Sequence, residues 1–174
     1  MRKVLVVIDM QEDFTRGALG SDAAQATIPV VANLVREFQG REEPIFYTRD
    51  THYDNYMETE EGKHLPIPHC LKNSDGWEIC PEVIDYEYWN NFIINKNSFG
   101  CIVWKDFPEQ FAVADEIVVC GLVSSICVIS NIAVLRALYP EVPMTLVSKG
   151  TAGLSDGNNA AALEVARSLQ VNVI

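Results

Sequence analysis

Residues 116–127 read EIVVCGLVSSIC, an apolar run that stops at a glycine and leads directly into a helical pattern. Apolar runs rich in Val and Ile, without alternating polar residues, are typical of strands that are covered on both faces of a parallel sheet. The residues that follow, 125–138, have the spacing of a helix. A strand, a short turn and a helix in this order predict one unit of an α/β fold.

The same alternation of strand and helix extends along the whole chain. Strands joined by helices run parallel with right-handed crossovers, so we expect a three-layer α/β sandwich around a mainly parallel, six-stranded, Rossmann-like sheet. The further predicted elements are strands at 4–9, 44–48, 91–95, 142–148 and 171–174, and helices at 26–39, 107–114 and 158–170.

The length and composition are those of a globular protein of one domain. Of the 174 residues, 48% are hydrophobic and 21% are charged, which excludes wholesale disorder. We therefore expect a single domain over residues 1–174. Lys and Arg number 13 against 24 Asp and Glu, a formal net charge of -11, and no basic cluster offsets it. This balance argues against a nucleic-acid partner.

Neither a membrane segment nor a disulfide framework is expected. No apolar run approaches the ~20 residues that span a bilayer, and the apolar stretch 4–8 is too short for the core of a signal peptide. The five cysteines are odd in number and have no CxxC spacing, so free thiols in a reducing compartment fit best. We expect a cytoplasmic protein with no membrane partner.

The segment 49–90 departs from the alternation of strand and helix. It has little regular periodicity, contains all three histidines, and is rich in proline and aromatic residues. Loops of more than about 12–15 residues inside a compact domain are usually functional or disordered, and the aromatic residues favour order. We expect an ordered loop that carries part of a functional site.

Polar residues follow four of the predicted strands. Asp9 ends the first strand and Lys96 the third. Asp50 and His52 follow the second, and Cys127 lies one turn beyond the fourth. Ligands of open α/β sheets bind beyond the carboxyl ends of the strands, where the strand order reverses. Each residue has an ordinary alternative role, as a turn cap, a solvated lysine or a small buried hydrophobe, but their coincidence at one edge favours a functional site.

Cys127 has the surroundings of a nucleophile. Cysteine attacks as the thiolate, and a first helical turn beside a cation such as Lys96 favours negative charge, so we expect a lowered thiol pKa. Asp9 is suited to accept the thiol proton and return it to a leaving amine. The backbone N–H groups of Val123 and Cys127 are suited to bind an oxyanion. This set predicts cysteine-dependent acyl transfer, whereas Cys120, inside a strand, is expected to be structural.

The loop after the second strand supplies candidate metal ligands. Asp50, His52 and His69 offer one carboxylate and two imidazoles, a set that leaves coordination positions open, as in catalytic Zn or non-haem Fe(II) sites. The alternative is that the histidines are ordinary exposed loop residues. His64 either supports these ligands or is a surface residue, and Glu58, Glu60 or Glu61 could complete the coordination sphere.

These residues stand within a set of motifs. In chain order the motifs are Asp9-Met10-Gln11-Glu12-Asp13-Phe14, Arg49-Asp50-Thr51-His52, Pro66-Ile67-Pro68-His69-Cys70, Gly76-Trp77, Lys96, and Gly121 to Val128. With them the chain resembles the isochorismatase-like cysteine hydrolases, and most closely their nicotinamidase/pyrazinamidase branch. The likeness runs in order from residue 4 to the C-terminal end, so it is far more specific than any single motif.

The resemblance implies roles for the site residues. Asp9, Lys96 and Cys127 would form a catalytic triad. A divalent metal ion, zinc in the first place with iron or manganese as alternatives, would coordinate the pyridine nitrogen of the substrate. The ligands of this ion would be Asp50, His52 and His69.

The resemblance also implies the shape of the substrate site. The turn before the nucleophile would hold a cis peptide at Leu122–Val123, and Phe14 would form an aromatic wall of the pocket. Two departures are visible. Ile126 stands where many relatives have a polar residue, and His64-Leu65-Pro66 contains no aromatic residue where nicotinamidases often have a tryptophan.

The resemblance and the residues together predict a metal-containing cysteine amidase that hydrolyses a small carboxamide. Nicotinamide, converted to nicotinate and ammonia through a thioester, is the first candidate. Two alternatives stay open: an amidase of the same family that acts on another small amide or carbamoyl compound, and a non-catalytic module that binds a small molecule. Family members are commonly oligomers, so we expect a homo-oligomer.

Overall fold

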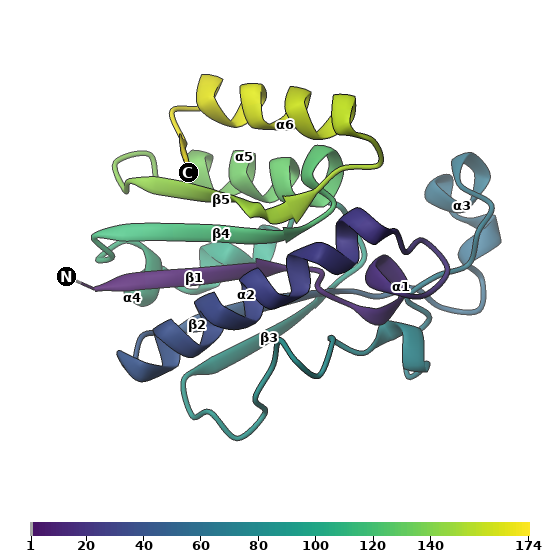
Figure 1. The fold of residues 1–174 in the computed structure, drawn as a ribbon, viewed down its shortest axis with the longest axis horizontal. Coiled ribbons are helices and arrows are strands. Elements are labelled where there is room, and N and C mark those ends of the chain that lie inside the picture. The colour runs from purple at the N-terminus through teal and green to yellow at the C-terminus, as the bar shows by residue number, and fades with distance from the viewer. Residues whose placement is uncertain (1) are drawn as a thin grey trace.

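The sheet contains six strands that are all parallel, as the sequence predicts. The computed structural model describes residues 2–174. The strands are β1 (Lys3–Ile8), β2 (Ile45–Asp50), β3 (Asn91–Lys96), β4 (Glu116–Leu122), β5 (Met144–Ala152) and β6 (Asn172–Val173). Their order in the sheet is β3-β2-β1-β4-β5-β6 (Figure 1). The order reverses between β1 and β4, which is where an open α/β sheet binds its ligands.

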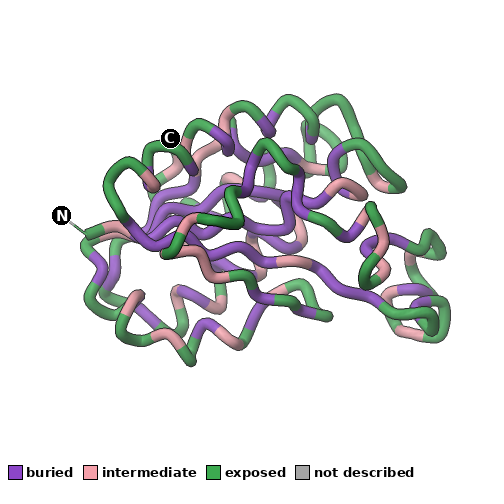
Figure 2. Tube along the Cα trace, turned by 90° about the horizontal axis from the view of Figure 1, so that it is seen from below, coloured by how far each residue is buried: buried purple, intermediate pink, exposed green. Residues whose placement is uncertain are grey.

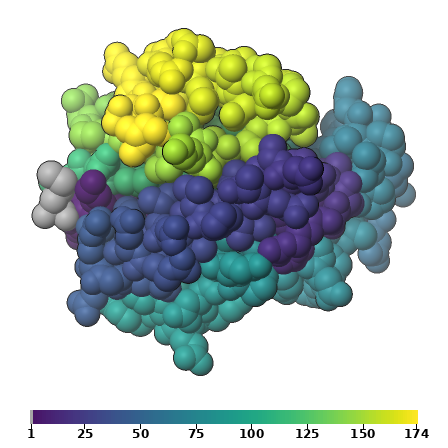
Figure 3. Space-filling view, in the orientation of Figure 1, coloured from purple at the N-terminus to yellow at the C-terminus, as the bar shows by residue number. Residues whose placement is uncertain are grey.

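Helices cover both faces of this sheet and give the molecule three layers. The helices are α1 (Glu12–Thr15), α2 (Asp22–Gly40), α3 (Glu60–His64), α4 (Pro108–Phe111), α5 (Ile129–Leu138) and α6 (Asp156–Ser168). In Figure 1, α2 crosses in front of the sheet, and Figure 3 shows that its side chains cover much of this face. Side chains of α4, α5 and α6 pack in the core on the other face.

Alternate residues of the central strand β1 enter the two cores. Val4, Val6 and Ile8 pack on the side of α5, whereas Leu5 and Val7 pack on the side of α2. All five side chains are fully buried. Both faces of the strand are therefore apolar, which explains why its sequence shows no alternation. Figure 2 shows the buried strands in the centre of the molecule, between helices with exposed outer sides.

The bounds of several predicted elements shift by two to four residues, as in α2 and β5, and two predicted helices differ in kind. The helix expected at 107–114 is the single turn α4, because the Asp115 N–H already donates a hydrogen bond to the Arg2 carbonyl oxygen and draws the chain into the sheet. The helix expected at 125–138 begins with a π-helical turn, Ser124–Val128, and continues as α5. This turn contains Cys127.

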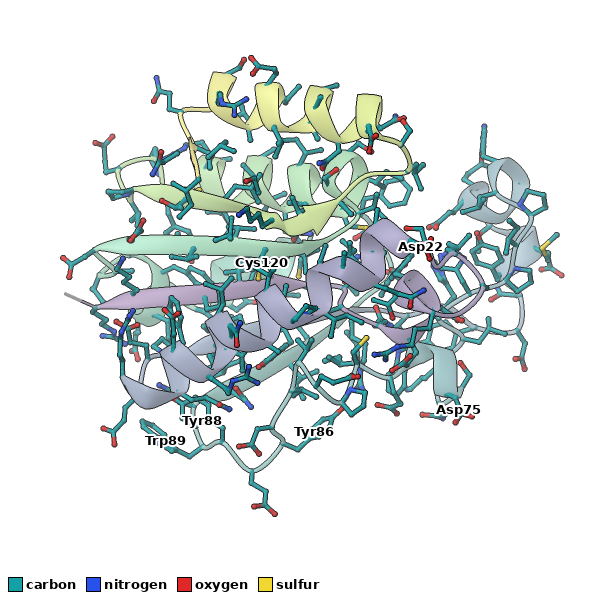
Figure 4. All side chains as sticks on the ribbon, in the orientation of Figure 1. Asp22, Asp75, Tyr86, Tyr88, Trp89 and Cys120 are labelled. Atoms are coloured by element: carbon teal, nitrogen blue, oxygen red, sulfur yellow. The ribbon has the colours of Figure 1, made fainter. Side chains whose placement is uncertain are left out.

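The long segment between β2 and β3 follows a defined course, as expected. It contains α3 and two 3₁₀ turns, Tyr56–Glu58 and Asp75–Trp77. An antiparallel bridge between Gln11 and Ile79 joins it to the chain just after β1. Its last part carries Tyr86, Tyr88 and Trp89 along the lower side of the molecule and leads into β3 (Figure 4).

A glycine allows the two central strands to approach each other at their carboxyl ends. Gly121 has a φ of 116°, which L-residues rarely adopt, and a Cβ atom there would overlap the carbonyl oxygen of Ile8. Ile8 directly precedes Asp9, and Gly121 directly precedes the turn that carries Cys127. The close approach therefore brings the two functional segments together.

The sequence also predicts free thiols and no membrane segment. All five cysteines are free, as the sequence predicts, and the structure shows that all five are buried. Cys120, labelled in Figure 4, lies in the core between the sheet and α2. Within residues 2–174, no helix combines the length and apolar character needed to cross a membrane.

Candidate active site

Asp9, Lys96 and Cys127 lie together beyond the carboxyl ends of the strands. Asp9 follows β1, Lys96 ends β3, and Cys127 lies in the turn after β4. Lys96 Nζ is 2.7 Å from Asp9 Oδ2 and 3.6 Å from Cys127 Sγ. No side chain of the three is more than 6% exposed. The structure thus holds an ammonium group in contact with both a carboxylate and a thiol.

Asp9 is fixed by the neighbouring strand β2. Thr48 Oγ1 donates a hydrogen bond of 2.6 Å to Asp9 Oδ1, and the Asp9 backbone N–H donates to the Thr48 carbonyl oxygen at 3.2 Å. Asp9 also has a φ of 45°, in a region that few residues other than glycine adopt and that often marks functional positions. These constraints hold the carboxylate beside Lys96.

The turn that carries Cys127 begins with an unusual peptide bond. The bond between Leu122 and Val123 is cis, as the resemblance implies. Among residues 2–174, the Val123 N–H donates to no backbone or side-chain acceptor. This N–H is therefore available to a ligand that approaches Cys127.

A buried asparagine on α5 fixes the same turn. Asn131 Nδ2 donates hydrogen bonds to the carbonyl oxygens of Cys127, at 2.8 Å, and Phe99, at 2.9 Å. Asn131 Oδ1 accepts hydrogen bonds from Cys101 N–H, at 3.0 Å, and Trp104 Nε1, at 2.8 Å. All donor and acceptor positions of the amide are thus used. Sequence reasoning missed this residue, and the one available signal was its position four residues after Cys127 on an apolar helix face.

The protonation of the site differs from the sequence expectation. Burial raises the pKa of the Cys127 thiol well above its usual value; the Asp9 carboxylate adds to this, and Lys96 acts in the opposite direction. The expected lowered pKa is therefore wrong, because the thiol lies deeper than a first helical turn at the surface. Burial also raises the pKa of Asp9, against the effect of Lys96. Burial opposes the charge of Lys96, but its acidic neighbours raise its pKa overall.

Four residues beside this cluster form a group suited to a metal ion. Asp50, His52, Glu61 and His69 each offer one ligand atom, and these atoms all lie within 4.8 Å of one another. His52 Nε2 is 3.1 Å from Asp50 Oδ2, and His69 Nε2 is 3.4 Å from Glu61 Oε1. Lys96 Nζ lies 3.5 Å from Asp50 Oδ1, so the two groups adjoin.

The chemistry of these four side chains fits a divalent cation. Two imidazoles and two carboxylates are ligands that zinc and iron both accept. His69 Nδ1 bonds to the Ile67 carbonyl oxygen at 2.8 Å, which fixes the tautomer and leaves Nε2 for a metal ion. Burial alone would raise the pKa of Asp50, but the His52 hydrogen bond and the Lys96 charge bring it below its usual value. The Asp50 carboxylate is therefore ionised.

The structure separates the further candidates that the sequence left open. Glu61 joins the group, whereas Glu58 and Glu60 have no ligand atom in it. His64 is exposed, and its Nδ1 lies 2.8 Å from the Glu60 carbonyl oxygen. His64 is thus outside the metal group, although it lines the pocket described below.

Two residues of the first motif hold the metal group in place. Gln11 Nε2 donates to the carbonyl oxygens of Asp50, at 2.9 Å, and Trp77, at 2.8 Å, while Gln11 Oε1 accepts the Asp50 N–H at 2.7 Å. Asp13 Oδ2 accepts the N–H of Cys70, next to His69, at 2.7 Å. Both residues stand in the first sequence motif, Asp9 to Phe14, which by itself gives no sign of this role. Their function is to fix the loop to the end of β1.

A pocket of about 620 Å³ opens onto both groups. Cys127, Asp50 and His69 line it, and the ring of Phe14 meets His69 edge-on with centroids 5.4 Å apart. Phe14 therefore lies in the pocket wall beside the metal group. Phe99 and Leu154 also line the pocket, and both are exposed.

Comparison with solved structures shows the fold. Pyrazinamidase/nicotinamidase from Streptococcus mutans superposes with a TM-score of 0.86 at 24% identity, covering 99% of each chain. Pyrazinamidase from Pyrococcus horikoshii in complex with zinc gives 0.81 at 25% identity, covering 100% of this chain and 99% of that one. N-carbamoylsarcosine amidase from Thermoplasma acidophilum gives 0.82 at 23% identity, covering 99% and 95%. Among curated proteins, none matches this chain by sequence.

The family is shown by the sequence itself. The model of the isochorismatase domain matches residues 3–174, nearly the whole chain. This match confirms the resemblance drawn from the ordered motifs. The fold, the six parallel strands and the family model agree, and the chain belongs to the isochorismatase domain family.

Proposed function

We propose that this protein is a cysteine amidase that hydrolyses a small carboxamide, with nicotinamide as the first candidate substrate. The observation that carries the proposal is the contact of Lys96 with both Asp9 and Cys127 at the wall of a pocket. Membership of the isochorismatase family and the likeness to pyrazinamidases and to N-carbamoylsarcosine amidase support it. We take residues 1–174 as one catalytic domain.

The proposed reaction has two halves that share one thiol. Asp9 accepts the proton of Cys127, and the sulfur attacks the amide carbon to form a C–S bond. The N–H groups of Val123 and Cys127 bind the oxyanion. The C–N bond then breaks, and Asp9 returns the proton to the nitrogen, which leaves as ammonia. Asp9 accepts a proton from the water that attacks the thioester, the C–S bond breaks, and this proton returns to the sulfur as the carboxylic acid leaves.

The raised thiol pKa fits this order of events. Burial and the Asp9 carboxylate both raise the pKa of the Cys127 thiol, so the reaction needs a base to remove its proton. Burial raises the pKa of Asp9 itself, which makes this carboxyl group a stronger base than an exposed one. The positive charge of Lys96 stabilises the thiolate that appears when the proton moves. Proton transfer is therefore coupled to the presence of a substrate carbonyl.

Asp50, His52, Glu61 and His69 would hold a divalent metal ion, zinc in the first place, with iron or manganese as alternatives. When bound, the ion would act as a Lewis acid toward a ring nitrogen of the substrate. Phe14 supports the ring from the side. This recognition distinguishes nicotinamide from benzamide, which has no ring nitrogen.

The test is ammonia release from nicotinamide by the metal-loaded wild type and by Cys127→Ala. We expect a loss of at least about a thousandfold in kcat/KM. Cys120→Ala, which changes a cysteine in the core, is the matched control and keeps activity within about threefold. Equal rates for the wild type and Cys127→Ala would remove the thiol from the mechanism.

A panel of amides separates the proposal from its nearest alternative. Faster turnover of pyridine carboxamides than of benzamide supports recognition of the ring nitrogen. Preference for a carbamoyl compound favours another substrate on the same scaffold. No release from any amide would favour a binding module. The cytoplasmic location and the homo-oligomer stay predictions.

A further inference from the structure

The pocket is larger than a single ring with one carboxamide requires. Its volume of about 620 Å³ lies in the middle of the range of pockets that bury drug-sized ligands. A carboxamide carbon placed at Cys127, with its ring beside the metal group, occupies only the buried part of this space. The part lined by Phe99 and Leu154 is left over.

The leftover part is apolar and exposed. Leu154 is 68% exposed and Phe99 is 44% exposed, although both are large apolar side chains. Leu19, Leu65 and Ile126 line the same pocket. This exposed apolar surface is continuous with the reactive centre. A ligand that covers it removes apolar area from water, which makes binding more favourable.

The lining of the pocket offers an anionic substituent no lysine or arginine side chain. Asp50, Glu60 and Glu61 line it, and none of its lining residues is a lysine or arginine. The formal net charge of the chain, -11, acts in the same direction. Glu60, at the outer wall, is exposed and already paired with Lys63, so a carboxylate or phosphate on the substrate would have no lysine or arginine of the lining to pair with.

We propose that the substrate is a neutral ring carboxamide with an apolar substituent that lies against Phe99 and Leu154. The inference rests on the proposed amidase function and deepens it by naming the substrate class. The substituent takes no part in the reaction: the amide C–N bond breaks as before, and the ring acid leaves with the substituent attached. Phe99 and Leu154 are thus specificity-determining residues.

Three nicotinamides test the proposal: the unsubstituted compound, 5-phenylnicotinamide and 5-carboxynicotinamide. With the metal-loaded wild type we expect kcat/KM for the phenyl compound to be about tenfold above that for nicotinamide, because apolar surface is buried on both sides. We expect the carboxylate compound to be at least about tenfold below nicotinamide. A phenyl compound no better than nicotinamide would overturn the inference.

A matched pair of variants tests the location of the substituent. Leu154→Asp places a charge at the outer wall, and we expect it to abolish most of the preference for the phenyl compound over nicotinamide. Val113 is 57% exposed and does not line the pocket, so Val113→Asp is the control and leaves the preference unchanged. An unchanged preference in Leu154→Asp contradicts the assignment.

Binding to Cys127→Ala keeps this inference distinct from the amidase proposal. Calorimetry with the metal-loaded variant measures the dissociation constants of nicotinamide and of the phenyl compound without turnover. Tighter binding of the phenyl compound supports the inference even if the wild type hydrolyses neither. Hydrolysis of nicotinamide together with weaker binding of the phenyl compound overturns the inference and leaves the amidase proposal standing.

Discussion

Lys96 Nζ lies 2.7 Å from Asp9 Oδ2, in an ion pair from which water is almost completely excluded. The two residues come from β3 and from the end of β1, so β2 separates their strands in the sheet. Lys96 also lies 3.5 Å from Asp50 Oδ1. One ammonium group therefore compensates carboxylates that belong to both parts of the site.

Replacing Lys96 should lower stability as well as activity. Lys96→Met leaves the Asp9 charge buried without its partner, and removal of one member of a buried ion pair typically costs about 3–5 kcal/mol. We expect the free energy of unfolding, measured in urea, to fall by about 3 kcal/mol. Lys105 is exposed, so Lys105→Met is the control and changes stability by less than about 0.5 kcal/mol. Equal effects of the two substitutions would contradict the role of the pair.

Removing the Asp9 charge should make Cys127 easier to alkylate. The thiol pKa is raised by burial and by Asp9, and is lowered by Lys96. In Asp9→Asn the raising effect of the carboxylate disappears while Lys96 stays, so the thiolate forms at lower pH. Iodoacetamide labelling of Cys127, followed by mass spectrometry, should rise at lower pH than in the wild type, with about tenfold faster labelling near pH 8.

The same variant should be unable to hydrolyse a carboxamide, because it has lost the proton acceptor. Faster alkylation together with lost turnover would show that Asp9 acts as the base, while Cys127 remains a competent nucleophile without it. Asp22→Asn removes an exposed carboxylate and serves as the control, with an unchanged labelling profile. A profile that moves to higher pH in Asp9→Asn would contradict the assignment that the Asp9 carboxylate raises the thiol pKa.

Removing the Glu61 carboxylate should weaken metal binding. Glu61→Gln keeps the shape of the side chain but loses the charge in the group formed with Asp50, His52 and His69. We expect the zinc dissociation constant, measured by competition with a chelator, to rise by about 10–100-fold. Glu58 is exposed and outside the group, so Glu58→Gln should leave the constant unchanged. Equal constants for the two variants would remove Glu61 from the site.

A methyl group at position 121 should disturb the meeting point of β1 and β4. Gly121→Ala forces a Cβ onto the Ile8 carbonyl oxygen at a φ of 116°, and we expect a loss of more than about 2 kcal/mol in unfolding free energy. A Cβ at Gly40, in the last turn of α2, meets no atom within 4 Å. Gly40→Ala should therefore be neutral or stabilising. A denaturant midpoint for Gly121→Ala equal to that of Gly40→Ala would contradict the packing argument.

The course of the chain could be read from the sequence because strand and helix signals are local. The apolar runs around Val4, Phe46 and Val118 mark three of the interior strands, and polar residues at the strand ends indicate the site. The depth of burial is not local. It depends on how β4, its turn and α5 pack together, and for this reason the pKa of Cys127 was expected to shift in the wrong direction.

The roles of residues that act through hydrogen bonds to other segments could not be predicted from the sequence either. Gln11 and Asn131 bond to residues more than twenty positions away, and a single sequence carries no record of such pairs. Glu61 could not be separated from Glu58 and Glu60, because only the orientation of α3 decides which carboxylate faces the histidines. Tertiary packing, and not residue type, makes these distinctions.

The anchoring of the loop by Gln11 and Asp13 limits which residues of this protein can be substituted during evolution. The short stretch that follows β1 begins with Asp9, the proposed proton acceptor. Further along it, Gln11 accepts the Asp50 N–H, and Asp13 accepts the N–H of Cys70, next to His69. A substitution in this stretch therefore disturbs the proposed base and the metal group together. Phe99 and Leu154 are not part of this anchoring. Substitutions of these two residues can therefore change the substrate during evolution while the catalytic residues keep their positions.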